Sequence, residues 1–124
     1  MAEQLANLAK GDELINRPDL WVVGTEYNFG NGLYGQRYTG TESYTQNVLK
    51  TTVLNASLTT LSGILAFGGS ITYNTYQQLA LPYMDNSVQF VVQSIPNTGL
   101  CLIGKTVESG KNNVPYTVWA LYKK

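Results

Sequence analysis

The sequence predicts an all-β domain, an antiparallel β-sandwich of jelly-roll-like type, preceded by a short N-terminal helical or extended segment. From Leu20 onward, apolar and polar residues alternate with the period of two that is typical of strands. Candidate strands recur every 8–12 residues and are separated by Gly, Asn and Pro, as in sandwiches and barrels. The composition agrees with this fold class, because 38 of the 124 residues are Thr, Ser, Asn or Gln, joined by 9 Tyr and 12 Gly.

The N-terminal residues have a different pattern from the rest of the chain. Leu5 and Leu8 have helical spacing, and a second short turn is expected before Pro18. Neither piece is long enough to be stable alone, so the segment should dock on its own domain or on a neighbour. We therefore divide the chain into an attachment or oligomerisation segment, residues 1–19, and a β-sandwich domain, residues 20–124.

The predicted strands follow in order along the domain. Residues 20–23 are aromatic and β-branched and predict an opening strand that ends at Gly24. Residues 27–29 and 33–41 flank Gly30-Asn31-Gly32, whose tolerance of positive φ predicts a hairpin turn. Further strands are predicted at 48–54, 64–67, 70–73, 77–81, 87–95, 100–103 and 114–122, with a turn or bulge at Gly68-Gly69 and a polar loop at 108–113.

Two of these strands carry the clearest patterns. In residues 87–95, Val88, Phe90 and Val92 form an apolar face. Residues 114–122 should lie inside a sheet, with Pro115 near the start of the strand, where a missing N–H is least costly. Trp21 and Trp119 sit within strand patterns and are expected to anchor the core.

Catalytic and metal-binding side chains are scarce. The chain has no histidine and one cysteine, Cys101, which excludes Ser-His-Asp and Cys-His nucleophile systems and structural zinc sites. The net charge is +0 and the pI about 6.1, without the basic surface that nucleic-acid binding requires. No apolar run approaches the ~20 residues of a membrane span, and the N-terminus does not resemble a signal peptide. We expect a binding or structural protein, not an enzyme, without cofactor, nucleic-acid partner or membrane insertion, and with Cys101 buried.

Charge is unevenly distributed along the chain. Residues 1–26 hold five acidic residues against two basic ones, whereas residues 105–124 hold four lysines against one glutamate. Attraction between the two ends or between subunits is one interpretation, and scattered solvated charge is the other.

Four carboxylates in or beside the predicted loops also allow two interpretations. Two of them could meet in a glycosidase-like groove, or all of them could be solvated. These carboxylates are Glu26, Glu42, Asp85 and Glu108.

A polar, aromatic stretch around Pro82 is the candidate ligand-binding surface. A tyrosine ring is a rigid apolar plate with a hydroxyl group, and with amide side chains it suits sugar rings or another protein. The alternative is that these tyrosines pack on strand faces and under loops. The candidate residues are Tyr73, Asn74, Tyr76, Gln77, Tyr83, Asp85 and Asn86.

The opening and closing residues of the domain resemble those of small β-domains at the C-terminal ends of bacteriophage tail-fibre and baseplate proteins. Such domains open with a V-G-x strand, a D/N-G turn and an L/I/V-Y-x-x-R/K strand, and they close with alternating Tyr, Val and aromatic residues before Lys. Here Trp21 precedes the Val-Gly-Thr run, and the turn carries the longer insert Asn28-Phe29-Gly30. The matching residues are Val23-Gly24-Thr25, Asn31-Gly32, Leu33-Tyr34, Arg37 and 116–124.

The resemblance implies a virion protein that forms homotrimers and contacts host-surface polysaccharide through exposed loops. It carries over no catalytic residue. It implies backbone roles for Gly24, Gly32 and Gly40, packing roles for Trp21 and Tyr34, and a place in the same structural motif for Arg37 and Trp119.

Three function classes remain open. The leading hypothesis is a phage appendage protein, at a tail-fibre or baseplate tip, that binds host polysaccharide or another host receptor. The second is a structural virion protein, such as a capsid decoration, head-fibre or baseplate joint, in which residues 1–19 contact other virion proteins. The third is a polysaccharide-cleaving enzyme.

Overall fold

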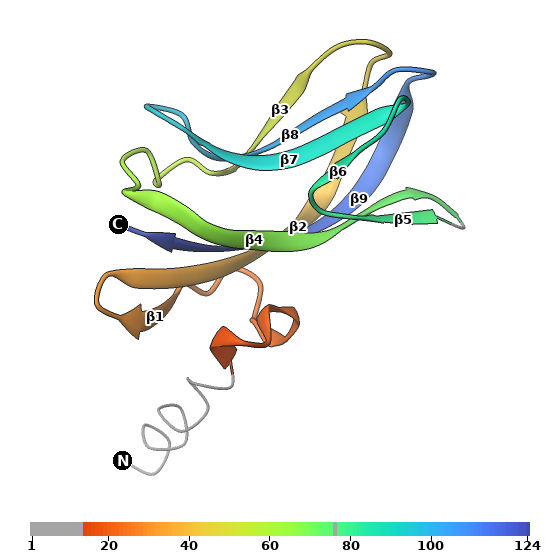
Figure 1. Cartoon of the computed structure of the whole chain (residues 1–124). Coiled ribbons are helices and arrows are strands. Elements are labelled where there is room, and N and C mark those ends of the chain that lie inside the picture. The colour runs from red at the N-terminus through yellow and green to blue at the C-terminus, as the bar shows by residue number, and fades with distance from the viewer. Residues whose placement is uncertain (1–13, 76) are drawn as a thin grey trace.

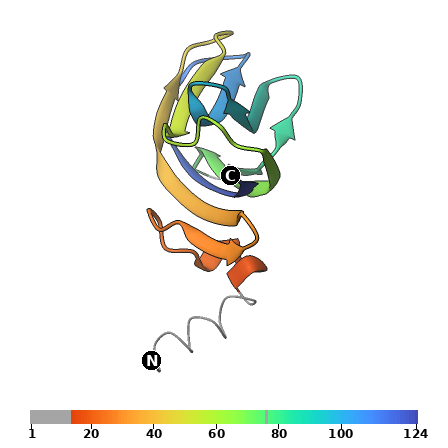
Figure 2. The ribbon, with the colours of Figure 1, turned by 90° about the vertical axis from the view of Figure 1, so that its left-hand side faces the viewer.

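The protein is an antiparallel β-sandwich, which confirms the predicted fold class. The computed structural model describes residues 14–75 and 77–124, and within them two sheets pack face to face (Figures 1 and 2). The five-stranded sheet has the order β1-β2-β9-β4-β5, and the four-stranded sheet has the order β3-β8-β7-β6. The strands are β1 (Tyr27–Gly30), β2 (Leu33–Tyr44), β3 (Lys50–Asn55), β4 (Gly63–Asn74), β5 (Gln77–Ala80), β6 (Tyr83–Met84), β7 (Val88–Ile95), β8 (Gly99–Thr106) and β9 (Lys111–Lys123).

Strand β9 lies in the middle of the five-stranded sheet, as predicted for the closing strand. It pairs with β2 from Leu33↔Lys123 onward and with β4 on its other side. Pro115 is the fifth residue of β9 and lies before Tyr116, the first β9 residue that pairs with β4. The strand begins three residues earlier than predicted, so part of the expected polar loop at 108–113 is strand.

The core lies between the sheets and is built from alternating residues. Val88, Phe90 and Val92 of β7 are buried in one core cluster with Val118 and Tyr122 of β9, in agreement with the predicted strand pattern. Cys101 is a free, fully buried thiol, also as predicted. Burial raises the pKa of this thiol, which keeps it protonated and unreactive.

The predicted opening strand at 20–23 is wrong. Leu20 ends a short 3-10 helix, η1 (Pro18–Leu20), and the next strand begins only at Tyr27. The Trp21 indole N–H donates to the Leu14 carbonyl at 2.6 Å, and the Trp21 and Thr25 amides close local turns. The Gly24 amide reaches the Arg37 carbonyl of β2 at 3.5 Å, but these local turns prevent a regular ladder, so strand propensity alone does not produce a strand here.

Trp21 is a buried anchor, as predicted, but it packs outside the cluster between the sheets, and Trp119 is only half-buried. Trp21 is 1% exposed and lies against Trp119 with ring centroids 6.0 Å apart. Tyr27 and Phe29 of β1 complete this aromatic cluster on the outer side of the five-stranded sheet. The cluster holds residues 14–26 against that sheet (Figure 1).

The predicted turn or bulge at Gly68-Gly69 is also wrong, because β4 runs through both glycines in continuous register with β9, and the register shift lies between Ile64 and Ala66. The indole ring of Trp119 lies so close to Gly68 that a β-carbon there would be 2.7 Å from Trp119 Cζ2. Gly69 has a φ of +115°. These glycines make room for a neighbouring strand and do not reverse the chain.

The predicted helical spacing at Leu5 and Leu8 lies outside the described residues. The boundary between residues 1–19 and 20–124 stays a prediction.

Candidate functional site

The described candidate residues lie at one end of the sandwich, away from the C-terminus (Figure 1). The β4–β5 hairpin carries Tyr73, Asn74 and Gln77, and the segment from β6 to β7 carries Tyr83, Asp85 and Asn86. Tyr76 lies outside the described residues.

A hollow of about 260 Å³ adjoins the β4–β5 hairpin. Tyr73 is half-buried in it, and Lys111 Nζ lies 4.7 Å from the centre of the Tyr73 ring. The Asn74 amide donates to the Gln77 side-chain oxygen at 3.2 Å. We call this hollow the Tyr73 hollow. Its lining residues are Thr72, Tyr73, Asn74, Thr75, Lys111, Asn112, Asn113, Val114 and Pro115.

Sequence reasoning found Tyr73 and Asn74 of this hollow but missed Lys111, Asn112 and Asn113. Those residues begin β9, which lies beside β4 because Ile71 pairs with Tyr116. The polar composition of residues 108–113 was the available signal, but nothing in it indicates the neighbouring strand.

The turn between β6 and β7 is organised by Asp85. Its carboxylate accepts bonds from the Tyr83 hydroxyl at 2.6 Å and from the Ser87 and Val88 amides at 2.6 and 2.9 Å. The Tyr83 bond, followed by the two amide bonds, lowers the pKa of Asp85. Asp85 therefore holds the turn, while Asn86 is exposed beside it.

The hairpin and the turn lie at the same end of the sandwich (Figure 1). Burial raises the pKa of Tyr73, and the nearby charges of Glu108 and Asp85 add to this effect. The Ser87 hydroxyl donates to Glu108 at 2.8 Å, and the Ser87 amide bonds Asp85. The phenol of Tyr73 thus lies within electrostatic reach of both carboxylates.

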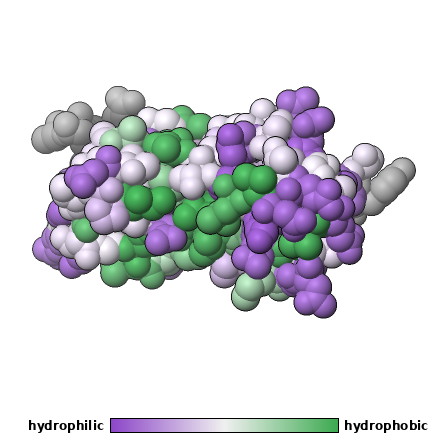
Figure 3. All heavy atoms as spheres, turned by 90° about the horizontal axis from the view of Figure 1, so that it is seen from above, coloured by the Kyte–Doolittle hydropathy of each residue, from purple (hydrophilic) through white to green (hydrophobic). Residues whose placement is uncertain are grey.

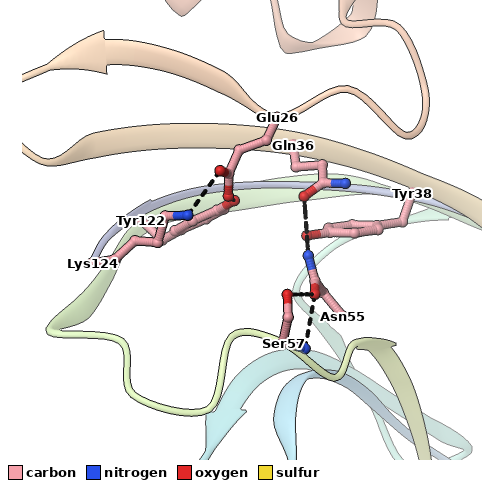
Figure 4. A network of polar contacts seen from close by, with 7 residues as sticks. All are labelled: Glu26, Gln36, Tyr38, Asn55, Ser57, Tyr122 and Lys124. Atoms are coloured by element: carbon pink, nitrogen blue, oxygen red, sulfur yellow. Dashed lines mark hydrogen bonds and ion pairs between the residues drawn. The ribbon is translucent and has the colours of Figure 1, made fainter.

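The other two candidate carboxylates are held elsewhere. Glu42 accepts a bond from the Thr52 hydroxyl at 2.8 Å and forms an ion pair with Lys50 at 3.6 Å. Glu26 forms an ion pair with Lys124 at 2.8 Å and accepts a hydrogen bond from the Tyr122 hydroxyl (Figure 4). The Glu26–Lys124 pair joins residues from the two oppositely charged parts of the sequence within one chain.

Glu26 belongs to a polar network that includes Lys124 (Figure 4). The C-terminus lies at the end of the sandwich opposite the β4–β5 hairpin (Figure 1). Asn55 donates to the Gln36 side-chain oxygen at 3.0 Å and to the Tyr38 hydroxyl at 3.1 Å, which ties β3 to β2. Burial raises the pKa of Tyr38 to about 12. The network joins the two sheets, so its evident role is structural.

The residues of the resemblance motif have structural contacts. Gly24 and Gly32 have φ values of +87° and +77°, and Gly40 faces the Tyr116 ring so closely that a β-carbon would lie 2.5 Å from its hydroxyl oxygen. Tyr34 stacks on Tyr122 with centroids 6.3 Å apart. Arg37 donates to the Trp21 carbonyl at 3.2 Å.

A second surface, missed by sequence reasoning, covers the outer side of the four-stranded sheet. Large apolar side chains gather there (Figure 3), and Met84 and Leu49 are 75% and 61% exposed. They surround a shallow hollow of about 400 Å³ that Pro82 and Ile103 also line. We call this surface the apolar face; its exposed residues are Val48, Leu49, Val53, Met84 and Val91.

Comparison of the chain with protein-family models, curated proteins and solved structures found no match. Among residues 14–75 and 77–124, no group of three or more His, Cys, Asp or Glu side chains is arranged to hold a metal ion. The same residues include no helix with the length and hydrophobicity to cross a membrane.

Proposed function

We propose that this domain is a non-enzymatic recognition domain of a bacteriophage virion appendage, at a tail-fibre or baseplate tip, and that it binds host-surface polysaccharide. The observation that carries the proposal is the Tyr73 hollow, where one aromatic ring meets a concentration of amide and hydroxyl groups. Sugars present hydroxyl groups around apolar ring faces, and this lining offers partners for both.

The chemistry of the surface supports binding over cleavage. Glycoside hydrolysis needs two carboxyl groups across the scissile bond, one with a raised pKa. The pKa of Asp85 is lowered by its hydrogen bonds, and its oxygens are occupied by the turn it holds. Glu26 and Glu42 each have a cationic partner.

The virion setting rests on the resemblance of the 23–37 and 116–124 motifs, with the homotrimer that it implies. In this proposal residues 1–19 contact other virion proteins. A chain with only 13% charged residues and an exposed apolar face is suited to such an assembly.

The test is binding of the full chain to immobilised surface polysaccharides from candidate bacterial hosts. Tyr73→Ala and Asn74→Ala should each weaken binding by about 1–3 kcal/mol, as truncation of a contact residue does. Thr60→Ala, an exposed position in the β3–β4 loop, is the matched control and should bind normally. Because Asn74 is exposed, its variant tests the site even if loss of the Tyr73 ring lowers stability. Absence of binding by the natural chain would reject the proposal.

Two other functions give different results in the same experiment. A structural virion joint would show no polysaccharide affinity, and the apolar face is the observation that favours it. A polysaccharide-cleaving enzyme would release new reducing ends from the bound polymer, and Glu108→Gln would then abolish that release.

A further inference from the structure

A second polar hollow adjoins β2 and the end of β3. Its volume is about 420 Å³, and no acidic residue is among the described residues that line it. We call it the Arg37 hollow. It is lined by residues 36–39 of β2, residues 54–56 at the end of β3, Tyr116 of β9, and Val23-Gly24 of the segment before β1.

The Arg37 hollow contains a cation without a counterion. Arg37 is half-buried, and none of the ion pairs within residues 14–75 and 77–124 includes it. Each acidic residue between positions 14 and 44 already pairs with another base, and these pairs are Asp19–Arg17, Glu26–Lys124 and Glu42–Lys50. Charged groups that leave water are normally balanced by a partner of opposite charge, so the guanidinium of Arg37 has the place of its counterion open.

The unpaired donors of Arg37 are the two that together hold a carboxylate. Its Nη1 donates to the Trp21 carbonyl at 3.2 Å. Its Nε is buried without a partner, and its Nη2, which remains accessible, donates to no described residue. Nε and Nη2 lie on one side of the planar guanidinium and bind the two oxygens of a carboxylate in parallel. Arg17 shows this arrangement filled, because its Nε and Nη2 donate to Asp19 at 3.1 and 2.9 Å.

The rest of the hollow places hydrogen-bond donors beside an aromatic ring. The Gln36 side-chain oxygen already accepts bonds from Tyr38 and Asn55 (Figure 4), which leaves its amide N–H groups for a ligand. The Tyr116 hydroxyl makes no hydrogen bond to any residue that the structure describes. A sugar acid presents a carboxylate, hydroxyl groups and an apolar ring face, and each of these has a partner in this lining.

We propose that the Arg37 hollow binds the carboxylate of an acidic sugar of the uronic acid class, with Nε and Nη2 of Arg37 on the two carboxylate oxygens. Gln36 and Tyr116 bind the hydroxyl groups of the sugar. A peptide strand does not fit this position equally well, because the Gly24 amide already occupies the backbone edge of β2 at the Arg37 carbonyl. The Arg37 hollow shares no lining residue with the Tyr73 hollow, so this proposal is tested separately from the proposed function.

NMR of the arginine side chains tests the contact at the atom that makes it. Arg17 and Arg37 are the arginines of the sequence, so the isotope-labelled full chain gives two Nε–H signals, and Arg17→Met assigns them. On titration with sodium glucuronate at constant ionic strength, the Arg37 signal should shift and saturate. The Arg17 signal should stay in place, because Asp19 already fills that side of its guanidinium. Glucose lacks the carboxylate and acetate lacks the ring, and each should bind about tenfold more weakly or worse, the loss expected when a charge-assisted hydrogen bond is missing.

Variants test the residues through the backbone amide shifts that glucuronate causes. Arg37→Lys keeps the charge but loses the paired donors, so affinity should fall about tenfold. Tyr116→Phe keeps the ring and should weaken binding about threefold, and it tests the site even if Arg37→Lys does not fold. Arg17→Met and Tyr73→Ala are the controls and should bind glucuronate like the natural chain.

Four results would overturn the proposal. The first is an Arg37 signal that does not move with glucuronate, and the second is an equal shift of both arginine signals. The third is unchanged affinity in a folded Arg37→Lys chain. The fourth is acetate, or a short peptide of acidic residues, that binds as tightly as glucuronate, because the hollow would then recognise a carboxylate without the sugar.

Discussion

The Cη2 atom of Trp21 lies 2.5 Å from the point that a β-carbon on Gly35 would occupy. Trp21 comes from the irregular segment before β1, and Gly35 lies near the start of β2. The missing side chain at Gly35 lets the indole ring approach the sheet closely beside Phe29. This close approach determines where the N-terminal segment sits.

Replacing Gly35 with alanine should destabilise the protein. The added methyl group must displace the indole ring or the strand, which costs about 1–3 kcal/mol in a well-packed site. The free energy of unfolding from urea titration measures the effect. Gly63→Ala is the control, because a β-carbon there would have no neighbouring atom within 4 Å, and it should change stability by about 0.5 kcal/mol or less. Equal stabilities of the two variants would contradict the packing described for Trp21.

Acid should weaken the fold partly through Glu26. Burial alone would raise the pKa of Glu26, but its hydrogen bonds with Lys124 and Tyr122 lower it below the model-peptide value. A carboxyl with a lowered folded pKa contributes stability above its unfolded pKa of about 4.3, and this contribution is lost as pH falls through the folded pKa. On going from neutral to acidic pH, the urea midpoint of unfolding should therefore fall less for Glu26→Gln than for the natural chain.

Asp19→Asn provides the comparison for that experiment. Asp19 forms an exposed ion pair with Arg17 at 2.9 Å, which solvent screens. Between neutral and acidic pH, the urea midpoint of this variant should fall about as much as that of the natural chain. If the urea midpoint of Glu26→Gln falls as much on acidification as that of the natural chain, the Glu26 pair does not stabilise the fold.

Alkaline pH should act through the buried tyrosines. Burial raises the pKa of Tyr38 to about 12, so the folded state favours the neutral phenol. The resulting stability is present below the unfolded pKa of about 10 and is lost as pH rises toward the folded value. Phenolate absorbs at 295 nm, and the absorbance difference between the natural chain and Tyr38→Phe isolates Tyr38. This difference should titrate near pH 12. A midpoint near 10 with native circular dichroism would contradict the burial of Tyr38.

Polysaccharide binding at the Tyr73 hollow should depend little on salt if the ligand is neutral. Between about 50 and 500 mM salt the affinity should change by less than about twofold, because screening acts on charge pairs. Lys111→Met tests this directly, since it removes the charge above the Tyr73 ring and keeps an extended apolar stem. An affinity that falls steeply with salt, and with Lys111→Met, would indicate an acidic polysaccharide instead.

Local patterns in the sequence were sufficient for much of the fold. The Gly30-Asn31-Gly32 hairpin formed as predicted because Asn31 and both glycines adopt positive φ, which few other residues tolerate. The alternation in β7 predicted its buried face, because one side of that strand packs on a core. Tyr73 and Asn74 could be placed in the candidate site because an aromatic, amide-rich hairpin is visible in a single stretch of sequence.

Only the tertiary structure decided the features that depend on distant partners. Residues 20–23 look like a strand, but Trp21 finds its partners on β2 and β9, so the segment stays irregular and its valines are exposed. Lys111 joins the Tyr73 hollow only because β9 pairs with β4. The apolar face combines Leu49, Met84 and Val91 from three separate segments. Local propensity acts over a few residues, whereas the pairing of strands and sheets that brings these side chains together is a property of the whole chain.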